Sequence, residues 1–394
     1  MKTGNQKLVK EINQSIVLKT IQQKGPLSRS ELASLTGLNK ATISTIVNNY
    51  IKSGMIYDIG IGHSNRGRKP VMLLLNKNAG FSIGIDLGVD YILGVLTDLD
   101  GNVIEEFNVE FTNKNPDYVI SLIKSSIQQL ILKAPESKYG IVGIGIGVPG
   151  VIDTDNKILL APNLNWRDVD ILKEIEKSFN LPVLVDNEAN AGAYGEKKYG
   201  SGKNISNLIY ISAGIGIGVG IILNNVLFKG KHGISGEVGH LSIHFNGKKC
   251  TCGNVGCWEL YASENALLKQ AKNLSTFHNL QQQIDIETVR VNASKGDKEV
   301  INLCNNIGKY MGVGIVNLIN TFDVEQIIIG NRLASLKDWI SNPIQRIIDQ
   351  RLLLKHSRNS LKLNYSELNN YSCALGASSF AISNFLFQDD LSFH

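Results

Sequence analysis

The sequence predicts an α/β protein that begins with a winged helix-turn-helix and continues as a two-lobed body. Three observations predict this architecture. A basic head rich in helical patterns occupies residues 1–78, glycine-marked strands alternate with helices from Phe81 onward, and a similar strand pattern recurs near Leu208. We expect the two lobes over 79–186 and 187–394, with the last helix returning to the first lobe.

Composition is that of an ordinary globular protein, since 43% of the residues are hydrophobic and 19% are charged. A chain of 394 residues is too long for one compact core. The most apolar stretch, 211–223, is too short and too rich in glycine to cross a bilayer, and the polar N-terminus does not resemble a signal peptide. We therefore expect a cytoplasmic protein with no membrane partner. Five cysteines, three of them close together, favour a metal site over disulfides.

Charge is unevenly distributed along the chain. Residues 1–80 contain 12 Lys and Arg but only 3 Asp and Glu, out of 40 and 35 in the whole sequence. Although the formal net charge is +5, the part after residue 80 is therefore mildly acidic. A basic head on an acidic body predicts that the head binds a polyanion such as DNA. On charge alone, a merely solvated basic face is an equal alternative.

The head contains the pattern of a helix-turn-helix. Apolar residues of helical period run over 8–21. A second helix begins after Ser28, which can cap it while Glu31 completes the capping box. Gly37 ends this helix, and a third helix with small polar residues near its start is expected over 40–53. This order is typical of proteins whose last helix enters the DNA major groove. A plain helical hairpin packed on the body is the alternative.

A β-hairpin wing is expected after the third helix. Segments 55–61 and 71–75 are predicted strands, and the basic residues between them would form the tip. Arginine at such a tip can enter a narrow minor groove, whereas a flexible basic linker would touch only phosphates. The expected DNA-contacting residues are Ser28, Arg29, Asn39, Lys40, Thr42, Ser44, Thr45, Arg66, Arg68 and Lys69.

Two segments of the body repeat the same strand pattern. In the first, a strand over 81–88 turns into a strand over 91–98. In the second, a strand over 208–212 passes through a glycine turn at 213–216 into a strand over 219–223. Each segment would open a lobe with an antiparallel meander. Two such lobes facing a cleft describe the actin-like architecture of sugar kinases.

Four stretches of the body resemble the ROK family, which groups repressors, open reading frames and sugar kinases. They are GIDLG at 84–88, GIGVPGVID at 145–153, VDNEANAGAYGE at 185–196, and GEVGH with CTCGNVGCWE at 236–259. The resemblance implies a homodimeric repressor that direct sugar binding releases from operator DNA. Within this resemblance, the combination of DNEANAGAYGE with GLNKATIS implies D-xylose as that sugar. An active ATP-dependent sugar kinase and a repressor controlled by a partner protein are the alternatives.

A compact group of cysteines and histidine predicts a structural zinc site. Three cysteines lie within 250–257, and glycines between them let one short loop present all three sulfurs. Three thiolates and an imidazole suit tetrahedral zinc with no open position. His232 or His244 could supply the imidazole instead of His240. The expected ligands are His240, Cys250, Cys252 and Cys257.

The same loop is expected to hold sugar ligands. Carboxylates that accept hydrogen bonds from neighbouring hydroxyls give a sugar site its directional contacts. The resemblance implies the sugar-binding residues Asn163, Asn187, Glu188, Glu237, His240 and Glu259. Among them Asn163 is the weaker candidate, and Glu259 could instead be a solvated residue in the first turn of the next helix.

The resemblance also implies that kinase chemistry has been lost. Where the kinases have an Asp base after the conserved Asn, this chain has Glu188, whose longer arm could still reach. Asp90 stands where a small Thr is usual, and its charge would repel nucleotide phosphates. Ala213 and Ile217 depart from the usual G-T-G-I-G-G-G phosphate loop. We therefore expect no enzymatic activity.

Overall fold

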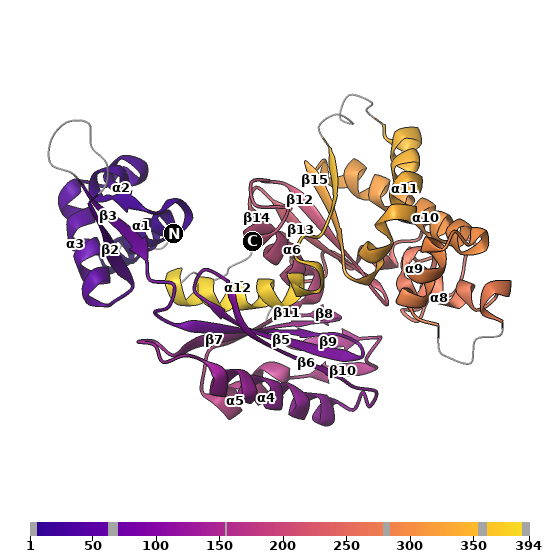
Figure 1. The fold of residues 1–394 in the computed structure, drawn as a ribbon, viewed down its shortest axis with the longest axis horizontal. Helices are drawn as coiled ribbons and strands as arrows, with labels where there is room; N and C mark the ends of the chain where they lie inside the picture. Colours follow the sequence, from indigo (N-terminus) through magenta and orange to yellow (C-terminus); the bar gives the residue numbers. More distant parts are fainter. Residues whose placement is uncertain (1–5, 62–69, 154–155, 279–283, 354–360, 388–394) are drawn as a thin grey trace.

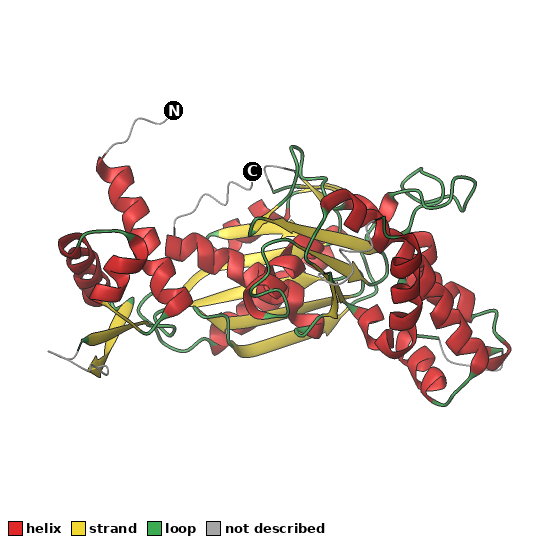
Figure 2. Ribbon diagram, turned by 90° about the horizontal axis from the view of Figure 1, so that it is seen from above, coloured by secondary structure: helices red, strands yellow, loops and turns green. Residues whose placement is uncertain are grey.

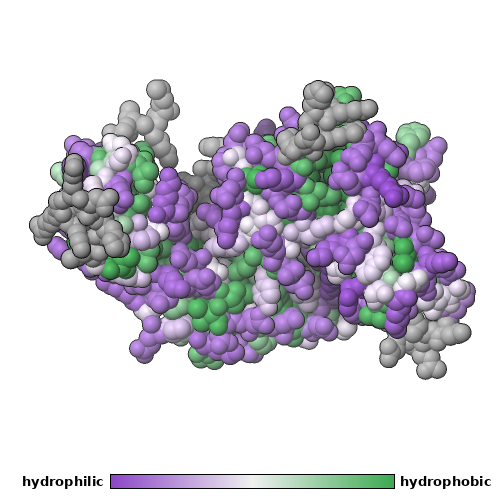
Figure 3. All heavy atoms as spheres, turned by 45° about the horizontal axis from the view of Figure 1, so that its top comes forward, coloured by the Kyte–Doolittle hydropathy of each residue, from purple (hydrophilic) through white to green (hydrophobic). Residues whose placement is uncertain are grey.

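A computed structural model describes residues 6–61, 70–153, 156–278, 284–353 and 361–387. In these ranges the chain forms a small head and two lobes, each lobe built on a five-stranded sheet (Figure 1). The expected wing tip with Arg66, Arg68 and Lys69 lies outside the described residues. None of the described helices has the length and apolar character needed to cross a membrane. On the face drawn in Figure 3, apolar side chains form separate patches among hydrophilic ones.

The head is a winged helix-turn-helix, as predicted. Its elements are α1 (Gln6–Lys24), β1 (Leu27–Ser28), α2 (Arg29–Thr36), α3 (Lys40–Lys52), β2 (Ile56–Ile61) and β3 (Val71–Leu75). The Ser28 side chain accepts a hydrogen bond from the Glu31 amide, and the Glu31 carboxylate accepts one from the Ser28 amide, so the predicted capping box is present. Gly37 ends α2 with φ at 72°, a left-handed conformation that glycine adopts without steric cost.

The apolar pattern of α1 is only partly buried. Val17, Leu18 and Ile21 are in the core. Ile12 and Ile16, which the helical period would bury with them, are 49% and 38% exposed. The N-terminal half of α1 extends beyond the rest of the head, so the described chain covers that part of the helix only partly (Figure 2).

The first lobe is a five-stranded sheet with helices on both faces. Its strands lie in the order β11-β7-β4-β5-β6. They are β4 (Phe81–Leu87), β5 (Tyr91–Asp98), β6 (Val103–Glu110), β7 (Ile141–Val148) and β11 (Val183–Asn187). α4 (Pro116–Lys133) and α5 (Ile171–Phe179) cover one face, and α12 (Ser372–Phe387) covers the other (Figure 1). A small sheet joins β8 (Val151–Ile152), β9 (Ile158–Ala161) and β10 (Trp166–Val169). Because β4 and β7 are covered on both faces, their sequences are almost continuously apolar.

The second lobe repeats the meander and adds a helical flank. Its strands lie in the order β14-β13-β12-β15-β16. They are β12 (Leu208–Ala213), β13 (Ile217–Leu223), β14 (Val226–Leu227), β15 (Gln326–Gly330) and β16 (Lys362–Tyr365). The helices are α6 (Glu188–Tyr199), α7 (Glu259–Ala262), α8 (Glu264–Ala271), α9 (Ile286–Ser294), α10 (Lys298–Phe322) and α11 (Lys337–Arg351). Short 3₁₀ turns are η1 (Glu237–His240), η2 (Ser275–Phe277), η3 (Arg332–Leu336) and η5 (Asn369–Tyr371). The predicted repetition of antiparallel strand pairs is confirmed, because β4 pairs with β5 and β12 with β13.

The head shares a hydrophobic core with the body. Apolar side chains of α1, α3 and the wing strands pack in one cluster with Leu99, Val142 and the end of α12. The hydroxyl of Tyr139 also donates a hydrogen bond of 2.9 Å to the carbonyl of Ser53, at the end of α3. The head therefore packs directly against the body.

Candidate functional site

Five of the predicted DNA-contacting residues lie near the start of α3. Asn39 caps this helix, its side-chain oxygen accepting a hydrogen bond of 2.8 Å from the Thr42 amide. Lys40 and Thr45 are exposed, whereas Thr42 and Ser44 are half-buried. Lys40 and Thr45 are therefore the residues of this set with the greatest freedom to reach a ligand.

Two other predicted residues have partners inside the head. Ser28 is buried and its hydroxyl caps α2, so its side chain is not available for DNA. Arg29 donates a hydrogen bond of 2.9 Å from Nη2 to the side-chain oxygen of Asn48 on α3. Asn48 and Asn49 lie one helical turn beyond Ser44 and Thr45 and are also exposed, so the spacing of four residues places them on the same side of α3.

A cleft lies between the two lobes. The β4–β5 turn, the β12–β13 turn, the start of α6 and the loop over 236–259 form its walls. All six predicted sugar-binding residues line it: Asn163, Asn187, Glu188, Glu237, His240 and Glu259. Residues from four separate parts of the sequence therefore converge on one cavity.

One wall of the cleft carries two carboxylates on either side of an imidazole. Glu259 Oε1 lies 3.5 Å from His240 Nδ1, and Glu237 Oε2 lies 4.0 Å from His240 Nε2. Burial raises the pKa of Glu237, and the nearby Glu259 carboxylate raises it further, while His240 opposes this effect. These groups offer closely spaced acceptors to a ligand rich in hydroxyls.

Asn163 and Glu259 approach each other across Gly216. A methyl group on Gly216 would lie 3.0 Å from Glu259 Oε2 and 3.3 Å from Asn163 Nδ2. Lys114 Nζ donates a hydrogen bond of 2.8 Å to the carbonyl of Asn163 and so supports this turn. The missing side chain at Gly216 thus leaves room between an amide donor and a carboxylate acceptor.

Glu188 has a buried, unpaired oxygen at the floor of the cleft. Its Oε2 has no hydrogen-bond partner among the described atoms. Burial raises the pKa of Glu188 from 4.5 to about 8, and the Glu237 and Asp86 carboxylates contribute in the same direction. Such a raised pKa favours the neutral acid, which can donate as well as accept a hydrogen bond.

Asn187 has much of its hydrogen-bonding capacity engaged by the protein. Its Oδ1 accepts hydrogen bonds from the amides of Ala189 and Asn190 and caps α6. Its Nδ2 donates a hydrogen bond of 2.9 Å to the carbonyl of Gly150. One N–H remains for a ligand, so the main role of this amide is to fix the start of α6 beside the cleft.

An ion pair joins the two lobes at the other end of the cleft. Arg332 Nη2 lies 2.7 Å from Asp90 Oδ1, and Arg332 Nη1 lies 3.5 Å from Glu264 Oε1. The guanidinium also lies 5.4 Å from the centre of the Tyr91 ring. The sequence alone leaves Asp90 as an unpaired charge, whereas the structure pairs it with this arginine, 242 residues away in the chain. No local pattern relates the two positions.

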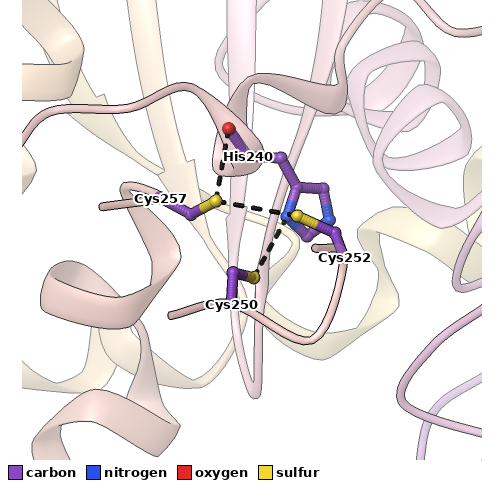
Figure 4. A group of neighbouring side chains, drawn as sticks. All are labelled: His240, Cys250, Cys252 and Cys257. Atoms are coloured by element: carbon purple, nitrogen blue, oxygen red, sulfur yellow. Dashed lines mark hydrogen bonds between the residues drawn. The ribbon is translucent and has the colours of Figure 1, made fainter. Parts of the chain in front are cut away.

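The predicted metal ligands form a compact cluster beside the cleft. One ligand atom from each of His240, Cys250, Cys252 and Cys257 can be chosen so that all four lie within 4.8 Å of one another (Figure 4). Cys250 and Cys257 are buried, and Cys252 is exposed. Burial, together with the two neighbouring cysteines, raises the pKa of the Cys257 thiol to about 12. A cation among the sulfurs would reverse this effect and stabilise thiolates.

Two distances in the cluster are close to the edges of a tetrahedron around a metal ion. Cys252 Sγ and Cys257 Sγ are 3.7 Å apart, and Cys250 Sγ lies 3.7 Å from His240 Nδ1. Bond lengths of ~2.3 Å to sulfur and ~2.0 Å to nitrogen require tetrahedron edges of about 3.8 and 3.5 Å. All four ligand atoms lie within 4.8 Å of one another, so the cluster could hold a metal ion. His240 would coordinate through Nδ1, which leaves Nε2 facing Glu237 and the cleft.

Comparisons with known proteins match both parts of the chain. Residues 82–384 match the ROK family, and residues 13–57 match a winged helix-turn-helix DNA-binding family. A xylose repressor from Bacillus spizizenii is 45% identical over 386 residues, which cover 98% of this chain and 99% of the relative. The similarity therefore includes the head, the cleft and the cysteine loop.

Solved structures give the same division. A ROK family transcriptional regulator, described as a homologue of the Escherichia coli MLC protein, superposes with a TM-score of 0.82 at 29% identity and covers 96% of this chain and 98% of its own. A ROK family glucokinase from Streptomyces griseus, in complex with glucose and AMPPNP, superposes with a TM-score of 0.71 at 27% identity. It covers 76% of this chain and 99% of its own. The regulator thus matches the whole chain, and the kinase matches about three quarters of it.

Proposed function

Since this chain belongs to the ROK family, we propose that it is a transcriptional repressor that binds D-xylose in the interlobe cleft and then leaves its operator DNA. Similarity to a xylose repressor over almost the full length supports both the repressor class and the sugar. The winged helix-turn-helix supplies the DNA-binding part, and the cleft supplies the sugar-binding part. A partner protein is not needed to explain either part.

The predominantly acidic lining of the cleft supports an unphosphorylated sugar as the effector. Among the described lining residues, only Arg332 and His240 can be positively charged, and Arg332 is already paired with Asp90. A phosphate would meet several acidic groups and no unpaired arginine, whereas a neutral polyol needs just such acceptors. The acidic lining residues are Asp86, Asp90, Glu188, Glu237 and Glu259.

Calorimetry with three ligand solutions tests this part of the proposal. We expect D-xylose to bind, D-xylose 5-phosphate to bind at least tenfold more weakly, and saturating ATP to leave the D-xylose affinity unchanged. The same ATP mixture should yield no ADP, because Ala213 lacks a hydroxyl donor and Ile217 adds bulk where a phosphate would approach. Preferential binding of the phosphorylated sugar, or steady ADP formation, would contradict the proposal.

We also propose that the metal in the cysteine cluster is zinc with a structural role. Three thiolates and one imidazole are a donor set that zinc favours, and they fill all four tetrahedral positions. The ion would hold the loop over 240–259 so that Glu259 and His240 face the cleft. Because no coordination position is left open, the sugar would contact His240 and the side chains near the cluster, and not the metal.

The working assembly is proposed to be a homodimer in the cytoplasm. Helix-turn-helix repressors commonly bind two half-sites about one helical turn apart, so that the symmetry of the dimer matches that of the operator. Light scattering on the purified protein, alone and with DNA, tests this assignment. A monomer that binds its operator with full affinity would contradict it.

Lys40→Ala is expected to weaken operator binding at least fivefold without changing sugar affinity. Lys40 is the first residue of α3 and is exposed, so it can reach a base edge or a phosphate. Fluorescence anisotropy measures the change, using a duplex selected by the wild-type protein from random sequences. Lys52→Ala is the matched control, because Lys52 is exposed at the far end of the same helix. Equal effects of the two substitutions would argue against DNA contact at the start of α3.

Glu188→Gln is expected to flatten the pH dependence of stability. The wild-type pKa is raised, so the stability contributed by the neutral acid is complete below about pH 4.5 and is lost as pH rises through about 8. Across that window the slope from this group can reach about 1.4 kcal/mol per pH unit. Urea unfolding at pH 5, 7 and 9 should show a smaller decline for the amide variant. Parallel pH profiles for the two proteins would mean that Glu188 is ionised in the folded state.

A further inference from the structure

Helix α12 lies between the sheets of the two lobes and reaches from the cleft to the head. In Figure 1 it crosses the first sheet, with α6 and the second sheet on its other side. Nearly every residue from Ser372 to Phe387 is buried. Cys373, Ala377 and Phe380 pack in one cluster with Tyr210 and other residues of the second lobe. A change in the angle between the lobes would therefore act on α12 from both sides.

The first turn of α12 lies at the floor of the cleft. Ser372 and Cys373 line a small cavity whose other walls include Asp86 and Glu188, and these two acids also line the main cleft. The Ser372 hydroxyl donates a hydrogen bond of 2.9 Å to Glu196, a buried residue of α6. The N-terminal end of α12 thus adjoins the groups proposed to bind the sugar.

The middle of α12 is fixed to its neighbours by backbone contacts. A methyl group on Gly84 of β4 would overlap the carbonyl of Ala374, and one on Gly145 of β7 would overlap the carbonyl of Ala377. On the other side, a methyl group on Gly376 would overlap a carbonyl of α6. Because backbone meets backbone here, no flexible side chains can absorb a displacement. A shift of either neighbour is therefore passed on to the whole helix.

The last turn of α12 belongs to the core of the head. Ile382, Leu386 and Phe387 pack in one cluster with α1 residues such as Val17 and Ile21. The ring of Phe385 lies 5.2 Å from that of Tyr139, whose hydroxyl bonds to the end of α3. Displacement of this turn would change how the DNA-reading helices pack against the body.

We propose that α12 is the rigid link that carries the state of the sugar cleft to the DNA-binding head. This inference rests on the proposed function, because it assumes that a sugar in the cleft weakens operator binding. A ligand that favours one angle between the lobes moves the buried helix, and the helix moves the shared core under α1. Two ends of one helix, one at each site, supply the physical connection that such coupling requires.

Leu386→Ala tests the link at its head end, away from the sugar. The measured quantity is the coupling ratio, the operator dissociation constant with saturating D-xylose divided by that without it. We expect the D-xylose affinity to stay within twofold of wild type and the coupling ratio to fall toward 1. The matched control is Leu73→Ala, which removes a buried leucine of the same cluster from β3. The control should lower stability but keep the wild-type ratio.

A second variant and a second measurement keep the inference testable if Leu386→Ala does not fold. Phe385→Leu alters a partly buried ring, so it should fold even if Leu386→Ala does not, and it should reduce the ratio by a smaller factor. Hydrogen exchange on the wild-type protein should show a sugar-dependent change over residues 17–24, absent in the α12 variants. Folded α12 variants that retain the full ratio would overturn the inference while leaving the proposed function intact. A wild-type ratio of 1 would overturn both.

Discussion

Cys257→Ser is expected to reduce bound metal from about one zinc ion per chain to none and to abolish sugar binding. Cys257 is fully buried, and the helix that carries Glu259 begins two residues later. Glu259 Oε1 also lies 3.3 Å from Cys250 Sγ, so the sugar-facing carboxylate is part of the wall around the ion. Binding of structural zinc contributes about 10–16 kcal/mol in small zinc domains, which makes the loop dependent on its metal.

Mass spectrometry for metal content and calorimetry for D-xylose measure the two parts of this prediction. Cys304→Ser is the matched control, because Cys304 is a buried free thiol in α10 outside the cluster. The control should retain the zinc and the sugar affinity. A folded Cys257→Ser protein that binds D-xylose with wild-type affinity would show that the ion does not organise the cleft.

Glu259→Gln is expected to reduce D-xylose affinity by about 1.5–3 kcal/mol, which corresponds to roughly 10- to 150-fold. The carboxylate is largely buried, faces Asn163 across Gly216 and touches His240. An amide of the same shape presents a donor where a sugar hydroxyl needs an acceptor, so a hydrogen bond to a charged group is lost. Operator binding in the absence of sugar should not change.

Calorimetry on the variant measures the effect, with Glu105→Gln as the control. Glu105 pairs with Lys133 on the surface of the first lobe, so its substitution removes a charge without altering the cleft. A Glu259→Gln protein with unaltered D-xylose affinity would support the alternative raised by the sequence, in which Glu259 is only a solvated residue at a helix start.

Local sequence signals predicted most of the fold. The capping box at Ser28, the left-handed end of α2 at Gly37 and the paired meanders are each determined by residues close together in the chain, and the structure agrees with them. The cysteine cluster was also predictable, because three of its four ligands lie within one short loop.

Contacts between distant residues were not predictable. The pairing of Asp90 with Arg332 depends on how the two lobes meet, and this pairing removes the unpaired charge that the sequence suggested. The raised pKa of Glu188 results from burial that only the assembled floor of the cleft produces. The exposure of Ile12 and Ile16 likewise reflects where the head ends, which a helical period cannot reveal.

The most direct test of the account is the release of operator DNA by D-xylose alone. Fluorescence anisotropy would follow a labelled operator duplex bound to zinc-loaded protein as D-xylose or D-glucose is added without ATP. We expect millimolar D-xylose to raise the operator dissociation constant by about 5- to 150-fold, the usual range of allosteric coupling. D-glucose, which carries an additional CH₂OH group, is expected to release less DNA than D-xylose does. An operator affinity that D-xylose leaves unchanged, while another sugar lowers it, would contradict the assignment of the effector.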